Sequence, residues 1–226
     1  LGKFHAQKYA KIPECELVAV VDSRLDQAEV VSASLGCAAL TDYRALLGKV
    51  DAVSIVVPTQ GHYDVCAEFL RAGVHVLVEK PMTTTLEQAD ELIRLAKENH
   101  CVLAVGHLER FNPAALALEP LLSDPRFIDS SRLAPFKPRA TDVSVLLDLM
   151  IHDVDLILSL VDSELESVEC SGARVLTADI DIANARIRFA NGCVANVTAS
   201  RVSAKSERKM RVFQEQACHS IDFQAR

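Results

Sequence analysis

Short apolar runs alternate with segments of helical periodicity over the first half of the chain, and this alternation limits the fold more than any other feature. The runs are rich in β-branched residues and apolar almost throughout, which is typical of strands buried on both faces. They cover residues 17–21, 52–57, 74–78 and 101–105. Two of the helical segments between them end at Gly36 and Gly73, where a left-handed cap is expected. The pattern predicts an α/β domain of the Rossmann type with a parallel sheet.

The second half of the chain has a different pattern, in which apolar and polar residues alternate. In the segment 183–200, Ala185, Ile187 and Phe189 alternate with arginines, and Asn191-Gly192 supplies a tight hairpin turn. Segments 167–176 and 219–223 are predicted to be further strands, and 144–161 a helix that precedes them. We therefore expect a dinucleotide-binding domain over 1–108 and an α+β domain over 109–226, with a largely antiparallel open sheet.

Composition excludes several classes of protein. The longest apolar runs are far shorter than the ~20 residues of a membrane span, and the chain starts without a signal pattern, so a cytoplasmic location and no membrane partner are expected. The seven cysteines are scattered without a Cys-x-x-Cys pair, which favours reduced cysteines and no metal site. A formal charge of −7 argues against a nucleic-acid partner.

Two strand ends carry candidate cofactor residues. Asp22 closes the first apolar run twenty residues after Gly2, close to the spacing between a phosphate loop and the acid that binds the adenosine ribose. Gly2 resembles the last glycine of such a loop, whose first strand and first glycines the chain lacks. An ordinary strand-ending aspartate is the alternative for Asp22. At the next strand end Pro58 stops the strand and Thr59 can cap a helix with His62 in its first turn, where helix-end packing is the alternative role for His62.

The segment after the third apolar run is unusual because three polar or rigid residues follow a buried strand at once. These are Glu79, Lys80 and Pro81, and the helix after them is predicted to begin with the capping pattern Thr84-x-x-Glu87. Further along, Asp148 and His152 are four residues apart on the predicted helix and project from one face. That helix is apolar almost all round, so its two polar groups need a reason. A buried His bonded to a buried Asp is the structural alternative.

Together these motifs resemble the Gfo/Idh/MocA oxidoreductases, a family of nicotinamide-dependent sugar and polyol dehydrogenases. The resemblance rests on Glu79-Lys80-Pro81, Pro58-Thr59-x-x-His62, "GHLERFNP" at 106–113 and "LLDLMIHDVD" at 146–155, and covers nearly the whole chain. It implies NAD as the cofactor, held by Gly2, Asp22, Pro58, Thr59, His62, Glu79 and Lys80. Arg24, two residues beyond Asp22, is a further candidate and leaves NADP open.

The resemblance also implies the catalytic residues. Lys80 would stabilise the negative charge on a substrate oxygen, His152 would remove the hydroxyl proton, and Asp148 would orient the same part of the sugar. Glu79 would orient the Lys80 ammonium or contact the cofactor, and Pro81 would follow a cis peptide bond. A solvated strand-end charge is the alternative for Lys80. Asp155 would give structural support.

Within the family the chain looks most like UDP-N-acetylglucosamine 3-dehydrogenases and related nucleotide-sugar enzymes. Basic side chains could meet a diphosphate, although such charges are usually solvated. They are Arg132, Lys137 and Arg139, and in a second stretch Arg201, Lys205, Arg208 and Lys209. An inositol or polyol dehydrogenase is the enzymatic alternative. The others are a non-catalytic NAD-binding scaffold and an enzyme that keeps its nicotinamide for a net epimerisation or elimination. An open apolar sheet face would make the protein a homodimer or homotetramer.

Overall fold

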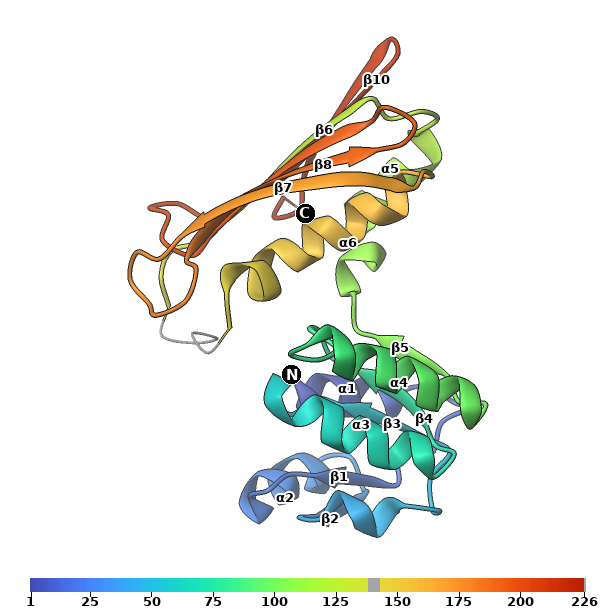
Figure 1. Ribbon diagram of the computed structural model, residues 1–226. Helices are drawn as coiled ribbons and strands as arrows, with labels where there is room; N and C mark the ends of the chain where they lie inside the picture. Colours follow the sequence, from blue (N-terminus) through green and yellow to red (C-terminus); the bar gives the residue numbers. More distant parts are fainter. Residues whose placement is uncertain (138–142, 226) are drawn as a thin grey trace. The chain divides into compact units, whose positions relative to one another are not determined.

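The computed structural model describes residues 1–137 and 143–225 and divides into two compact units, Leu1–Gly106 and His107–Arg226 (Figure 1). The boundary expected from the sequence, after residue 108, lies two residues beyond this division. Each unit has its own apolar core.

The first unit alternates parallel strands with helices. In chain order its elements are α1 (Gly2–Tyr9), β1 (Ala19–Val21), α2 (Leu25–Ala33), β2 (Ala38–Leu40), β3 (Ala52–Ile55), α3 (His62–Arg71), β4 (His75–Val78), α4 (Leu86–Glu98) and β5 (Leu103–Val105). Strand β1 pairs with β2, and β4 lies between β3 and β5 in a second sheet. Every pair is parallel, which confirms the Rossmann-type pattern.

The elements of the first unit follow the sequence in order, but β1, β3 and β5 are each two residues shorter than the predicted runs, and two further features differ. Gly36 and Gly73 have φ of 73° and 77°, so both glycines adopt the expected left-handed conformation. The short strand β2, with the sequence Ala-Ala-Leu, was missed because alanine is depleted in strands. The predicted cap of α4 is wrong by one residue, since the Thr85 side chain accepts from Gln88 N at 3.3 Å and the Gln88 side chain accepts from Thr84 N.

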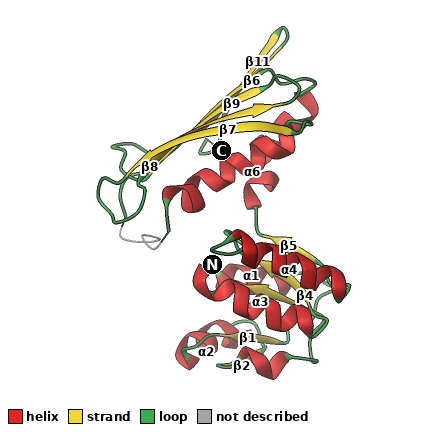
Figure 2. Cartoon of the chain, viewed as in Figure 1, coloured by secondary structure: helices red, strands yellow, loops and turns green. Residues whose placement is uncertain are grey.

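The second unit is one mixed sheet with helices on one of its faces (Figure 2). Its elements are α5 (Pro113–Leu118), β6 (Phe127–Leu133), a π-helical turn (Leu146–Met150), α6 (Ile151–Leu160), β7 (Leu165–Ala173), β8 (Ile182–Phe189), β9 (Val194–Ser200), β10 (Glu207–Gln214) and β11 (Ala217–Asp222). The strand order is β11-β10-β6-β9-β8-β7, and only the β6–β9 pair is parallel. The largely antiparallel sheet is thus confirmed, whereas β6 and β10 were missed.

The alternating pattern of β8 and β9 sets which side chains enter the core. Ala185, Ile187 and Phe189 are at most 4 % exposed, and Gly192 has φ of 86° in the turn that joins the two strands. The expected apolar open face is not found on β8 and β9, where most side chains that alternate with the core residues are polar and only Ile182 and Val194 are apolar. The polar side chains are Asn184, Arg186, Arg188, Asn196 and Thr198. Apolar residues fill the face that packs against α6 instead.

Candidate active site

Asp22 and Arg24 lie at the carboxyl end of β1, where both side chains are exposed. The backbone N–H of Arg24 donates to Asp22 Oδ1 at 3.0 Å. The Arg24 guanidinium turns to Asp26 instead, with Nη2 donating to Oδ2 at 2.7 Å, and this bond raises the pKa of Arg24 and lowers that of Asp26. The Asp22 carboxylate therefore remains available to ribose hydroxyls, while the Arg24 cation is already paired.

Gly2 opens α1, whose first turn has no side-chain cap. The N–H groups of an uncapped first turn favour an anion, as they do for the pyrophosphate of a dinucleotide. A Cβ on Gly2 would come within 3.9 Å of Val56 Cβ, which is ordinary contact. Gly2, Asp22 and the paired Arg24 thus fit NAD, since an acid at the strand end accepts ribose hydroxyls and disfavours a ribose phosphate.

The second strand end differs from expectation at Pro58 and Thr59. Strand β3 already ends at Ile55, so Pro58 does not stop it. Pro58 precedes a 3-10 turn, Thr59–Gly61, and no side-chain bond caps either this turn or α3, so the expected capping by Thr59 is wrong. His62 begins α3, as predicted for a residue in its first turn. The His62 ring is 1 % exposed, with Nδ1 at 2.8 Å from Pro81 O and Nε2 at 2.9 Å from Val57 O.

Glu79, Lys80 and Pro81 follow β4, and the Lys80–Pro81 peptide bond is cis, as expected. Glu79 is 7 % exposed and its Oε1 lies 3.0 Å from His5 Nε2. The carboxylate thus contacts α1, a partner that the sequence did not indicate. Lys80 is half-buried.

The helix that carries Asp148 and His152 is not a continuous α-helix. Asp148 lies in the π-helical turn Leu146–Met150, and His152 lies in the first turn of α6. The N–H of Ile151 donates to Leu146 O, five residues back. The expectation that both side chains share a face assumed α-helical spacing throughout, and a π-turn changes that spacing. Such turns are frequent at functional sites. Both side chains are half-buried.

Two ion pairs anchor α6 through residues that closely follow His152. Arg132 on β6 bonds Asp153 through Nε at 2.6 Å, and Arg110 bonds Asp155 through Nε at 2.8 Å and Nη2 at 2.6 Å. Arg132 is 2 % exposed, so the expected diphosphate contact of Arg132 is wrong. The sequence identified Asp155 as support, but not its partner Arg110.

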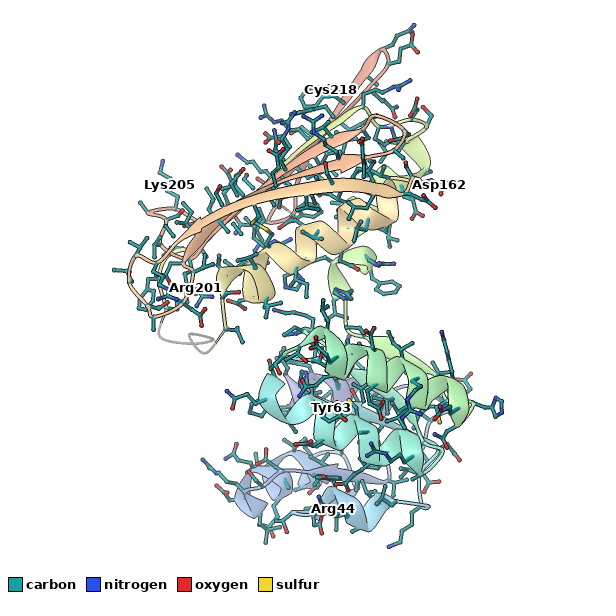
Figure 3. All side chains as sticks on the ribbon, viewed as in Figure 1. Arg44, Tyr63, Asp162, Arg201, Lys205 and Cys218 are labelled. Carbon is teal, nitrogen blue, oxygen red and sulfur yellow. The ribbon has the colours of Figure 1, made fainter. Side chains whose placement is uncertain are left out.

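The remaining basic residues have separate environments. Arg201 is buried and its Nη2 donates to Val143 O at 2.6 Å, whereas Lys137, Lys205, Arg208 and Lys209 are exposed. Arg201 and Lys205 lie near one end of the sheet, and Asp162 near the other (Figure 3). Arg139 lies outside the described residues.

A hollow of about 380 Å³ on the first unit is lined by none of the predicted site residues, although two of its lining residues, Gly61 and Tyr63, flank His62. It is bordered by Arg44 and Tyr63 (Figure 3), and Arg44 Nη2 and Tyr43 OH both bond Glu68 Oε1, at 2.7 and 3.0 Å. Its rim is therefore occupied by an internal ion pair.

Comparison with known proteins covers both units. Residues 1–107 match the model described as "Oxidoreductase family, NAD-binding Rossmann fold", and residues 123–220 match the "GFO/IDH/MocA C-terminal domain". The chain is 46 % identical to UDP-N-acetylglucosamine 3-dehydrogenase from Acidithiobacillus ferrooxidans, over 99 % of this chain and 71 % of that protein. A crystal form of that enzyme aligns with a TM-score of 0.92 over the same shares of both chains.

More distant relatives act on cyclic polyols. The scyllo-inositol 2-dehydrogenase (NAD(+)) of Bacillus subtilis is 30 % identical over 90 % of this chain, which spans 65 % of that protein's length. The chain thus spans less than two thirds of this relative.

None of the helices in 1–137 and 143–225 is both long and apolar enough to cross a membrane. The two family matches together cover most of the sequence, and the chain belongs to the Gfo/Idh/MocA family of NAD-binding oxidoreductases.

Proposed function

We propose that the protein oxidises the 3-hydroxyl of UDP-N-acetylglucosamine or a closely related nucleotide sugar, with NAD as the hydride acceptor. The observation that carries this proposal is the 46 % identity to a UDP-N-acetylglucosamine 3-dehydrogenase over 99 % of the chain. Because the identity extends over both units, it includes the parts of the fold to which the family assigns the cofactor and the substrate.

The proposed chemistry divides between three side chains. His152 takes the proton of the sugar hydroxyl, and imidazole suits that task because its ordinary pKa lies near neutrality. Lys80 donates hydrogen bonds to the same oxygen and stabilises the negative charge that develops on it. Asp148 accepts a hydrogen bond from a neighbouring hydroxyl and so orients the sugar. Nicotinamide, when bound, would accept the hydride from the sugar carbon that carries the oxidised hydroxyl. The products are a keto sugar, NADH and a proton.

The residues of the first unit support NAD as the cofactor. We assign the ribose hydroxyls to Asp22 and the pyrophosphate to the N–H groups of the turn that begins at Gly2. The exposed Pro58 and half-buried Thr59 follow β3 and would border the nicotinamide half. The pairing of Arg24 with Asp26 at 2.7 Å favours NAD over NADP, because it leaves no unpaired arginine beside Asp22 for a ribose phosphate.

The experiment is a substrate screen with the full-length protein. NAD and NADP are each offered with UDP-N-acetylglucosamine, UDP-glucose, myo-inositol and scyllo-inositol, and the absorbance of the reduced cofactor is followed. We expect turnover with UDP-N-acetylglucosamine and NAD. Turnover with the inositols alone would identify a polyol dehydrogenase. Cofactor binding without any turnover would indicate a scaffold, and product without released NADH would indicate a retained nicotinamide.

We also propose a cytoplasmic homodimer or homotetramer. All seven cysteines are free, as a reducing compartment favours. Because the open face of β8 and β9 carries polar side chains, a contact between copies through this face would depend on hydrogen bonds and ion pairs. Light scattering of the full-length protein at low and high salt tests this, and a monomer under both conditions would contradict it.

A further inference from the structure

Glu79, the residue before Lys80, is tied to two other elements of the first unit. Its Oε1 lies 3.0 Å from Nε2 of His5 on α1, and the other ring nitrogen, Nδ1, lies 2.7 Å from Ser54 Oγ on β3. One tautomer satisfies both contacts, because Nε2–H donates to the carboxylate while Nδ1 accepts from the serine hydroxyl. The His5 ring thereby connects α1 and β3 to the residue that follows β4.

Gly106 allows the Glu79 carboxylate to lie where it does. A Cβ at position 106 would be 2.9 Å from Glu79 Oε1, closer than real Cβ contacts, and 3.1 Å from its Cδ, which is tighter than most of them. The Gly106 N–H donates to Val78 O at 2.8 Å, and Glu79 N donates to Ile55 O at 3.0 Å. The backbone around Glu79 is therefore fixed by the sheet, and a side chain on residue 106 would displace the carboxylate.

His62 holds the residue on the other side of Lys80. Its Nδ1 lies 2.8 Å from the carbonyl oxygen of Pro81, and its Nε2 lies 2.9 Å from that of Val57. A carbonyl oxygen only accepts, so whichever ring nitrogen carries a hydrogen donates it to the carbonyl beside it. Since His62 is 1 % exposed, water does not replace either contact. The ring joins the end of β3 to the turn after β4.

From these contacts we propose that His5, Gly106 and His62 are positioning residues, which fix the backbone on both sides of Lys80. A lysine ammonium sits on a flexible four-carbon stem, so its position depends on a fixed Cα. Displacement by about 1 Å from a distant change can lower a rate by about 100-fold. This inference rests on the role of Lys80 in the proposed function. His62 thus contacts the backbone after β3 and after β4 and has a structural role, with no contact to the nucleotide.

A double-mutant cycle with Lys80 tests the proposal in the full-length protein, with NAD and the nucleotide sugar that turns over. Gly106→Ala and His62→Gln are each made alone and in the Lys80→Ala background, and kcat and KM are measured. We expect each to lower kcat about 10- to 100-fold in the parent enzyme, with the KM for NAD near its parent value. In the Lys80→Ala background each of the two substitutions should lower kcat less than about threefold, because each acts on kcat only by displacing Lys80.

The matched control is His75→Gln. His75 lies at the other end of β4, where its Nδ1 accepts from Val102 N at 3.0 Å, and its replacement should leave kcat unchanged. Equal losses of kcat in both backgrounds, or no loss in the parent, would overturn the positioning role while leaving that of Lys80 intact. An unchanged kcat in Lys80→Ala would overturn the role of Lys80 and this inference with it. Should Gly106→Ala not fold, His62→Gln carries the same test.

Discussion

The Arg132 guanidinium donates to both carboxylate oxygens of Asp153, from Nε to Oδ2 at 2.6 Å and from Nη2 to Oδ1 at 3.3 Å. Both side chains are buried, at 2 % and 1 % exposure. Burial opposes the charged guanidinium, but Asp153 and Glu109 outweigh it and raise the pKa of Arg132. Ser130 Oγ also donates to Asp153, at 3.0 Å. The pair connects β6 to α6 at the residue directly after His152.

Removal of one member of this pair should be costly. Asp153→Ala leaves the Arg132 cation buried with only the partly exposed Glu109 nearby, so the free energy of unfolding should fall by about 3–5 kcal/mol. Urea unfolding of the full-length protein, followed by circular dichroism, measures the change. Asp162→Ala, at an exposed site, is the control and should change it by less than about 0.5 kcal/mol. The double variant Arg132→Met/Asp153→Leu should regain most of the loss, and equal stability of Asp153→Ala and the parent would contradict the assignment.

The Rossmann-type half could be predicted because its signals are local. Buried parallel strands need continuous apolar runs. Gly36 and Gly73 lie at helix ends where the backbone adopts the left-handed conformation that favours glycine. The missed strand β2 has no such signal, since Ala-Ala-Leu has low strand propensity and pairs with β1 through tertiary contact alone. The helix cap moved from Thr84 to Thr85 because two adjacent threonines offer the same chemistry.

Several site residues were missed or given a wrong role because their hydrogen-bond partners are distant in the sequence. Arg132 has the charge of a phosphate ligand, but its acceptor Asp153 lies 21 residues away and only the fold shows that they meet. His5 carried no signal at all, although it contacts Glu79 from 74 residues away. The π-helical turn at Asp148 was also invisible, because the apolar sequence around it suits an α-helix equally well.

Asp181 should make the stability of the second unit depend on pH. Burial opposes its charge, but bonds from Thr177 N and Oγ1, Val175 N and Leu176 N together hold the pKa of Asp181 well below its usual value. The ordinary pKa of this carboxyl group, which applies in the unfolded chain, is 3.8. Below this pH the unfolded state is therefore protonated at Asp181 while the folded state is not. The stabilisation is present above 3.8 and is lost as pH falls toward the folded pKa.

Asp181→Asn tests this dependence. Its amide has no charge to be protonated, so the thermal midpoint should fall less between about pH 5 and pH 3 than in the parent. The comparison uses differential scanning calorimetry of both proteins in the same buffers. Asp162→Asn, at an exposed site, serves as the control and should keep the steep parent dependence. The same slope in Asp181→Asn and the parent would contradict the assignment.

Thiol reactivity should divide the cysteines by burial. Burial raises the pKa of Cys66 to about 12, so its reactive thiolate is scarce at neutral pH. Cys15, Cys170 and Cys218 are exposed. In the folded full-length protein we expect these three to react with Ellman's reagent within minutes, while Cys66 reacts only after denaturation. Peptide mapping after labelling identifies each site, and early modification of Cys66 would show that the core around α3 opens readily.

The cofactor preference should depend on the Asp22 carboxylate. Its charge would repel a ribose phosphate, and a like-charge contact costs several kcal/mol, so Asp22→Ser should shift the ratio of kcat/KM for NAD and NADP toward NADP by about tenfold or more. Steady-state kinetics with both cofactors measure the ratio. Asp26→Ser is the matched control, because it removes the partner of Arg24 and leaves Asp22 in place. A larger shift in Asp26→Ser than in Asp22→Ser would assign the discrimination to Arg24.

His152 should matter for the proton step and not for cofactor binding. His152→Asn keeps a hydrogen-bonding side chain of similar size but removes the base, and general-base catalysis contributes about 100- to 10,000-fold, so kcat should fall within that range. The Kd for NAD, measured by calorimetry, should remain near the parent value. Asp148→Asn should raise the KM for the sugar and lower kcat less, since it orients the substrate. If His152→Asn retained the parent kcat, the base would have to be another residue. Lys80→Met, which also removes a titratable group, would then be expected to show the larger loss of kcat and a changed pH profile.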